Sequence, residues 1–145
     1  MMILLVGLGV LAAGMVFVYL RPQPQWLNLG SLTDFPPQDK PYLIEAESIF
    51  YLVHTSDQLA VFKPETPHPA NQRYLWQADH QRFEDPLTGS RFKLDGTYFC
   101  GPADRNLDQY TYKISDGELW VSLSVVRPGE PVIEPKTGPD DCLRE

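Results

Sequence analysis

The sequence has little positive charge, and this excludes one broad class of partner. Among 145 residues, 12 lysines and arginines stand against 19 aspartates and glutamates, which gives a formal net charge of −7. Nucleic-acid-binding proteins usually present a basic face to the phosphates. We therefore exclude nucleic acid as a partner.

Cysteine is also scarce, since the chain has two, Cys100 and Cys142. Two cysteines are too few for a disulfide framework, and these lie too far apart for a Cys-x-x-Cys metal pair. A disulfide between them would tie the C-terminal tail to the loop after a predicted strand, and it would favour an oxidising compartment. Two unpaired thiols are the alternative, and the sequence leaves both open.

Sequence motifs of common catalytic sites are missing. The chain has no Gly-x-Ser-x-Gly, no His-Glu-x-x-His and no phosphate-binding loop. Gly89-Ser90 has no evident base beside it, and we expect its hydroxyl to make hydrogen bonds within its loop. We therefore expect a protein that is not an enzyme.

A long apolar run opens the chain. Residues Met1 to Leu20 carry no charged side chain, and a helix of about 20 residues spans about 30 Å, the thickness of a bilayer core. A signal peptide normally has a basic start and a small-residue cleavage site, and neither is clear here. The run predicts a transmembrane anchor over residues 1–20. Arg21 favours a cytoplasmic domain by the positive-inside rule, whereas a disulfide would favour the extracytoplasmic side, which we expect.

Prolines and turn residues divide the rest of the chain. Residues 21–41 contain five prolines, which predict an extended linker. Residues 127–145 are rich in proline, glycine and acidic residues and predict an extended tail. Between them, residues 42–126 contain short β-branched and aromatic runs separated by turns, which indicates an all-β barrel or sandwich. The predicted strands are Ile49–Val53, Leu59–Phe62, Arg91–Leu94, Thr97–Phe99, Thr111–Ile114 and Glu118–Leu123, with residues 74–76 either a strand or an ordered loop.

The stretch Asp85-Pro86-Leu87-Thr88-Gly89-Ser90 leads into Phe92, an Asp95-Gly96 turn and Gly101-Pro102-Ala103. In Rieske iron–sulfur domains the corresponding loop reads Cys-Pro-x-His-Gly-Ser, and Phe, a glycine turn and Gly-Pro-Ala follow it. The chain therefore resembles this family from about Tyr42 to Leu123. The resemblance implies a small Rieske-like β domain over residues 42–126.

The resemblance also locates four ligand positions of the [2Fe–2S] cluster. The family uses Cys-x-His in one loop and Cys-x-x-His in the next, and Thr66-Pro67-His68 and Asp85 to Thr88 correspond to them. Residue by residue, Thr66 and Asp85 replace the cysteines, His68 is retained, and Thr88 replaces the second histidine. One ligand of four cannot hold the cluster, and aspartate is a hard ligand for a soft centre. The resemblance thus implies a degenerate domain without cofactor.

Another metal is the alternative for these loops. Histidines and aspartates that might converge are His54, His68, Asp79, His80 and Asp85. A useful site needs three or four ligands, and the loops offer His68 and Asp85. We expect His68 instead to hydrogen-bond within its loop or to contact a partner.

These observations lead to one functional hypothesis and two alternatives. The expected function is a non-catalytic, single-pass membrane subunit that stabilises or docks a larger respiratory or photosynthetic electron-transfer complex. Its partners would be integral membrane subunits, and lipid through residues 1–20. The alternatives are a redox or metal protein with an unusual site near His68 and Asp85, and an independent membrane-tethered binding module.

Overall fold

The computed structural model describes residues 25–67, 73–134 and 142. These residues form ten strands and one short 3-10 helix, Leu32–Asp34, so the all-β prediction is confirmed. The strands are β1 Trp26–Ser31, β2 Tyr42–Glu45, β3 Ile49–His54, β4 Leu59–Phe62, β5 Leu75–Gln77, β6 Arg82–Glu84, β7 Arg91–Phe92, β8 Tyr98–Cys100, β9 Gln109–Ser115 and β10 Glu118–Arg127.

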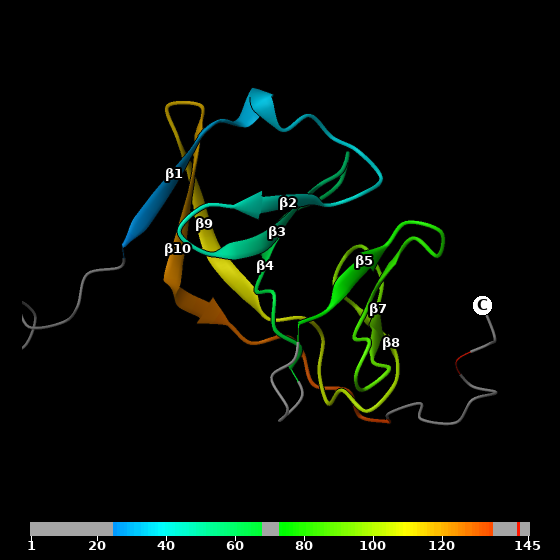
Figure 1. Ribbon diagram of the computed structural model, residues 1–145. Coiled ribbons are helices and arrows are strands. Elements are labelled where there is room, and N and C mark those ends of the chain that lie inside the picture. The colour runs from blue at the N-terminus through cyan, green and yellow to red at the C-terminus, as the bar shows by residue number, and fades with distance from the viewer. Residues whose placement is uncertain (1–24, 68–72, 135–141, 143–145) are drawn as a thin grey trace, which may run out of the picture.

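The strands make two antiparallel sheets. Six strands follow the order β1-β10-β9-β4-β3-β2, and four follow the order β5-β6-β7-β8. In Figure 1, β1, β9 and β10 lie at one side of the molecule, β2, β3 and β4 in the middle, and the four-stranded sheet at the other side. The middle strands therefore lie between two layers.

Strand β3 explains this arrangement because it is buried on both faces. Side chains alternate along a strand, so Phe50 and Leu52 join one core while Tyr51 and Val53 join the other. A strand covered on both faces reads as a continuous apolar run, as residues 49–53 do. One core lies within the six-stranded sheet and includes Phe50, Leu52, Val61, Tyr110, Leu119 and Val121. The other lies against the four-stranded sheet and includes Tyr51, Val53, Phe62, Tyr74, Phe83 and Phe92.

The predicted hairpins are also confirmed. Strands β9 and β10 pair across Asp116 and Gly117, whose φ angles are 55° and 80°. A two-residue turn with two positive φ angles matches the right-handed twist of the strands it joins. Strands β3 and β4 pair across residues 55–58, and β7 and β8 pair across the Asp95-Gly96 turn.

The predicted linker over residues 21–41 is wrong for its central part. Residues Trp26–Ser31 form β1, which pairs with β10 at the edge of the six-stranded sheet. Leu27 and Leu29 pack against the core of that sheet. The prolines of this region fall outside Trp26–Ser31, so every residue of β1 keeps the backbone N–H that strand pairing needs.

The predicted extended tail over residues 127–145 is wrong where the structure describes it. Strand β10 continues to Arg127, and the chain then returns along the loop that precedes β9. The Asn106 N–H donates to the Glu130 carbonyl at 2.9 Å, and the Val132 N–H donates to the Asp104 carbonyl at 2.8 Å. These hydrogen bonds pair backbone N–H and carbonyl groups of the returning chain with those of the loop before β9. The proline and glycine content of the sequence does not predict this pairing.

The predicted anchor over residues 1–20 lies outside the described residues. Within residues 25–67 and 73–134, no helix is long and apolar enough to cross a membrane. The anchor therefore stays a prediction from the sequence.

Candidate functional site

Two loops at one end of the four-stranded sheet contain the predicted site residues. The first joins β4 to β5 and is described up to Pro67 and again from Arg73. The second, residues 85–90, joins β6 to β7. Its base is closed by a hydrogen bond of 2.8 Å from the Asp85 N–H to the Ser90 carbonyl, and Gly89 turns the chain with a φ of 77°.

The carboxylate of Asp85 joins the two loops. The side chain is buried, with 1% of its surface exposed. Its Oδ1 accepts the N–H groups of Leu87 at 2.9 Å and Thr88 at 3.3 Å, while its Oδ2 accepts the hydroxyls of Thr88 at 2.5 Å and Thr66 at 3.4 Å. Burial of a carboxylate is costly unless donors surround it, and these four donors compensate for it.

Ser90 extends this set of hydrogen bonds. Its side chain is fully buried, and its Oγ lies 3.1 Å from the Thr88 Oγ1. Because the Thr88 hydroxyl donates to Asp85, the Ser90 hydroxyl donates to Thr88. The expected role of Ser90 in loop hydrogen bonding is confirmed. We call Thr66, Asp85, Thr88 and Ser90 the loop network.

The loop network does not fit a [2Fe–2S] cluster. The structure brings together Thr66, Asp85 and Thr88, three of the four predicted ligand positions, while His68 lies outside the described residues. Their side chains offer two hydroxyls and a carboxylate, and these groups bind one another. A cluster of this kind needs thiolates on one iron. The polar atoms at this place act as a hydrogen-bonded clamp between loops.

The histidines considered for another metal do not join the network where they are described. His54 places its Nδ1 2.5 Å from the Phe35 carbonyl, and His80 places its Nδ1 3.4 Å from the Glu84 carboxylate. Asp79 is exposed in the turn after β5. No group of three metal-binding side chains occurs among the residues that the structure describes.

A third loop, which follows β8, packs against the second loop of the site. Gly101 follows β8 with a φ of 104°, and a Cβ added there would lie 2.5 Å from the Ser90 Cα and 2.8 Å from the Gly89 carbonyl oxygen. The Tyr98 hydroxyl donates to the Gly101 carbonyl at 2.7 Å. The backbone at Gly101 therefore packs directly on the second loop.

The structure joins Cys100 and Cys142 in a disulfide, with their Cα atoms 5.6 Å apart. Cys100 is fully buried at the end of β8. The Arg91 guanidinium donates to the Cys142 carbonyl at 3.1 Å. Of the two states that the sequence left open, the structure has the bonded one, which fastens Cys142 beside β7 and β8.

The ion pair between Arg105 and Asp108 was missed by sequence reasoning. The Arg105 Nε and Nη2 donate to the two Asp108 carboxylate oxygens at 2.9 and 3.0 Å, and its Nη1 donates to the Pro67 carbonyl at 3.3 Å. The Gly129 N–H also donates to Asp108 at 3.0 Å. One fork thus connects the first loop, the segment before β9 and the returning chain. The sequence signal that could have predicted this ion pair is the presence of opposite charges three residues apart.

Acid is expected to weaken the fold through Asp108. Burial opposes ionisation of this carboxyl, but hydrogen bonds from Arg105 and the Gly129 N–H outweigh it and hold the Asp108 pKa below its usual value. A folded-state pKa below the unfolded-state pKa gives stability that is complete above the unfolded value and is lost as the pH falls through the folded value. We therefore expect the melting temperature to decrease once the pH is lowered below about 4.

The matched variant for this prediction is Asp108→Asn, measured by thermal unfolding between neutral and acidic pH. The variant should be less stable than the wild type at neutral pH. The difference in melting temperature between the two proteins should shrink as the pH is lowered. A difference in melting temperature that stays constant with pH would contradict a contribution from Asp108 ionisation.

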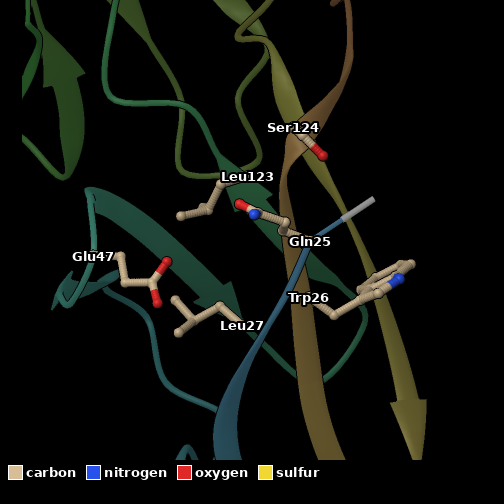
Figure 2. Close-up of a pocket in the computed structure, with 6 residues that line it drawn as sticks. All are labelled: Gln25, Trp26, Leu27, Glu47, Leu123 and Ser124. Carbon is tan, nitrogen blue, oxygen red and sulfur yellow. The ribbon is translucent and has the colours of Figure 1, made fainter. Parts of the chain in front are cut away.

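A pocket of about 360 Å³ lies elsewhere, at the start of β1. Its lining residues are Gln25, Trp26, Leu27, Glu47, Leu123 and Ser124 (Figure 2). It belongs to the six-stranded sheet and shares no residue with the loop network. Glu47 is its one charged lining residue, and the one hydroxyl of the lining, that of Ser124, lies 3.2 Å from the Ser122 Oγ.

One solved structure supports this architecture. No protein-family profile and no curated protein sequence matches the chain. A crystal structure of the cyanobacterial plasma membrane Rieske protein PetC3 from Synechocystis PCC 6803 matches with a TM-score of 0.50 and 22% identity, over 66% of this chain and 98% of that one. The ferredoxin of carbazole 1,9a-dioxygenase from Nocardioides aromaticivorans IC177 matches with a TM-score of 0.45 and 16% identity, over 68% of this chain and 97% of that one.

The likeness to PetC3 carries the assignment, and at this identity it concerns the fold. The sequence predicted a tight loop, a short strand, the Asp95-Gly96 turn, a second strand and a Gly-Pro loop in this order, and the structure has β7 and β8 paired there. The resemblance is therefore confirmed as a likeness of architecture, while the residues of the loop network differ from the ligands of a cluster. The chain has the Rieske fold.

Proposed function

We propose that this chain is a non-catalytic subunit with a Rieske fold and no cluster, which is anchored in a membrane and docks or stabilises a larger electron-transfer complex. The observation that carries the proposal is the loop network. Thr66, Asp85 and Thr88 stand at ligand positions and bind one another. Protein hydrogen bonds thus join the described part of the first loop to the second loop.

The tip of the second loop supports a docking role. Leu87 is 68% exposed, yet its backbone N–H is held by the buried Asp85 carboxylate at 2.9 Å. An apolar side chain on a preorganised loop loses little conformational entropy when it meets a partner. We propose that Leu87 is a contact residue of the docked complex.

The membrane and its side rest on two further features. Residues Met1 to Leu20 are apolar and uncharged, as a membrane span requires. The disulfide between Cys100 and Cys142 suits an oxidising compartment. We therefore propose a single-pass protein whose domain lies on the extracytoplasmic side.

Purification of the tagged full-length chain from its native membranes tests the docking proposal. We expect the wild type to co-purify in mild detergent with integral membrane subunits that carry haem or iron–sulfur absorbance. Leu87→Asp should reduce that absorbance per mole of tagged chain at least about tenfold, because a charge at the centre of a contact is desolvated without a partner.

The matched control is Leu43→Asp. Leu43 is 52% exposed on β2 of the other sheet, so this variant should co-purify like the wild type. A wild-type chain that purifies alone, or equal recovery with Leu87→Asp, would contradict docking through this loop.

A further inference from the structure

One face of the six-stranded sheet carries two tryptophans and a lysine. In the pairing of β1 with β10, Trp26 lies opposite Ser122 and Asn28 lies opposite Trp120. In the pairing of β10 with β9, Trp120 lies opposite Lys113. Paired residues share a face, so Trp26, Trp120 and Lys113 all project from the same side. Leu27, Leu119 and Val121 project from the other side into the core.

These three residues form one contact group, which we call the tryptophan face. The Lys113 Nζ lies 4.3 Å from the centroid of the Trp26 ring and 5.7 Å from that of Trp120. Such distances give an attraction between the ammonium group and the aromatic rings. Lys113 is exposed, and both indoles are partly exposed. In Figure 2 the Trp26 indole extends away from Leu27 and Leu123.

The tryptophan face lies close to the apolar N-terminal run along the chain. Trp26 follows Leu20 after six residue steps, and an extended chain covers at most about 3.6 Å per residue, or roughly 20 Å in all. If residues 1–20 span a bilayer, the start of β1 must lie within that distance of the bilayer surface. The surface around Trp26 is then the part of the domain that meets lipid first.

Trp26 lies at the end of the six-stranded sheet that is farther from the hairpin turn between β9 and β10. Beyond Ser122, the partner of Trp26, strand β10 continues to Val125 and Val126, which are 43% and 38% exposed. Val126 pairs with Tyr110 and so projects from the core side of the sheet. Acidic residues gather at the opposite end, where Glu118 accepts a hydrogen bond of 2.9 Å from Asn28 and Asp116 forms the hairpin turn. The pocket beside Trp26 has one acidic lining residue, Glu47, so the end of the sheet nearest the N-terminal run is less acidic than the hairpin end.

We propose that the tryptophan face rests in the headgroup region of a phospholipid bilayer and fixes the orientation of the domain. This inference rests on the anchor of the proposed function. Tryptophan suits the interface because its ring is apolar and its N–H is polar, and lysine can extend its ammonium group toward the phosphates. The four-stranded sheet lies at the other side of the molecule (Figure 1), which leaves its loops available to a protein partner.

The three tryptophans of the chain make a direct test. Three full-length variants each keep one of Trp26, Trp76 and Trp120 and have phenylalanine at the other two positions. Each is reconstituted in phosphatidylcholine vesicles with bromine near the headgroup end of the acyl chains, which quenches nearby indoles. Trp76, on the four-stranded sheet with its ring 5.0 Å from that of Phe83, is the internal control.

We expect Trp26 and Trp120 to be quenched at least about twice as strongly as Trp76, since interfacial indoles lie at headgroup depth. In the variant that keeps Trp26, Lys113→Glu should reduce quenching, because it replaces an ammonium group near the phosphates with a carboxylate. Thermal unfolding of each variant identifies a sequence that fails to fold, and iodide quenching in folded variants measures exposure to water independently.

Flotation of the vesicles separates the two proposals. A chain that floats with the lipid while Trp26 and Trp120 are quenched no more than Trp76 would overturn the lipid contact and leave the anchor intact. A chain that does not float would overturn the anchor and the contact together. Iodide quenching of Trp26 that is equal in vesicles and in detergent would also overturn the contact.

Discussion

Replacing Asp85 with alanine is expected to destabilise the domain by about 3 kcal/mol or more. The substitution removes the acceptor of two hydroxyls and two backbone N–H groups. An unpaired buried polar group costs about 1–3 kcal/mol, and Thr66 is 3% exposed. Chemical denaturation of wild type and variant, with the unfolding free energy extrapolated to zero denaturant, measures the loss.

Two substitutions separate the causes of that loss. Asp85→Asn keeps an acceptor for the N–H groups of Leu87 and Thr88, so it should cost less than Asp85→Ala. Asp95→Ala is the control for an exposed cap, because Asp95 accepts a single N–H, that of Thr97, at 2.8 Å in an exposed turn. It should cost about 1 kcal/mol or less, as other exposed caps do. Equal losses for Asp85→Ala and Asp95→Ala would contradict a central role for Asp85.

Replacing Gly101 with alanine is expected to destabilise the domain by about 2–4 kcal/mol. A positive φ contributes about 1 kcal/mol for a residue with a Cβ, and overpacking a tight contact adds about 1–3 kcal/mol. The added Cβ would lie 2.5 Å from the Ser90 Cα, and backbone atoms cannot move aside as the end of a side chain can. Because the clash displaces the second loop, backbone amide shifts at Gly89 and Ser90 should accompany the loss.

Gly117→Ala is the matched control for this variant. Gly117 has a φ of 80°, but a Cβ there would meet no atom within 4 Å. Its cost should therefore reflect the backbone conformation, about 1 kcal/mol. The difference between the two variants, measured by the same denaturation experiment, isolates the contact of Gly101 with the second loop. A difference near zero would show that the second loop moves to accommodate the added Cβ at little cost in free energy, and would contradict the prediction.

Much of the strand pattern could be predicted because local signals and the fold agree. The β-branched and aromatic run Ile49–Val53 and the Asp116-Gly117 turn each specify local geometry that the sheet then uses. Strand β1 was missed because Trp26–Ser31 is a short apolar alternation between prolines, and its stability comes from pairing with β10, almost a hundred residues later. Such long-range pairing leaves little trace in the local sequence.

The candidate site was likewise predictable from the sequence only in part. The order of loops and turns located Thr66, Asp85 and Thr88, and the structure brings these residues together. The direction of each hydrogen bond was not predictable, since a hydroxyl both donates and accepts. Gly101 and the fork of Arg105 on Asp108 depend on contacts between segments, which the spacing of residues does not reveal. The sequence therefore located the positions, and the structure supplied their chemistry.

Iron analysis combined with electron paramagnetic resonance tests the central claim most directly. The full-length protein is purified from its native membranes, separated from other subunits, and reduced, with a cluster-bearing Rieske protein treated in parallel as the positive control. Because a carboxylate and hydroxyls stand at described ligand positions, the expected result is no stoichiometric iron and no Rieske-type signal. Stoichiometric iron with that signal would contradict the account and make this chain an electron carrier.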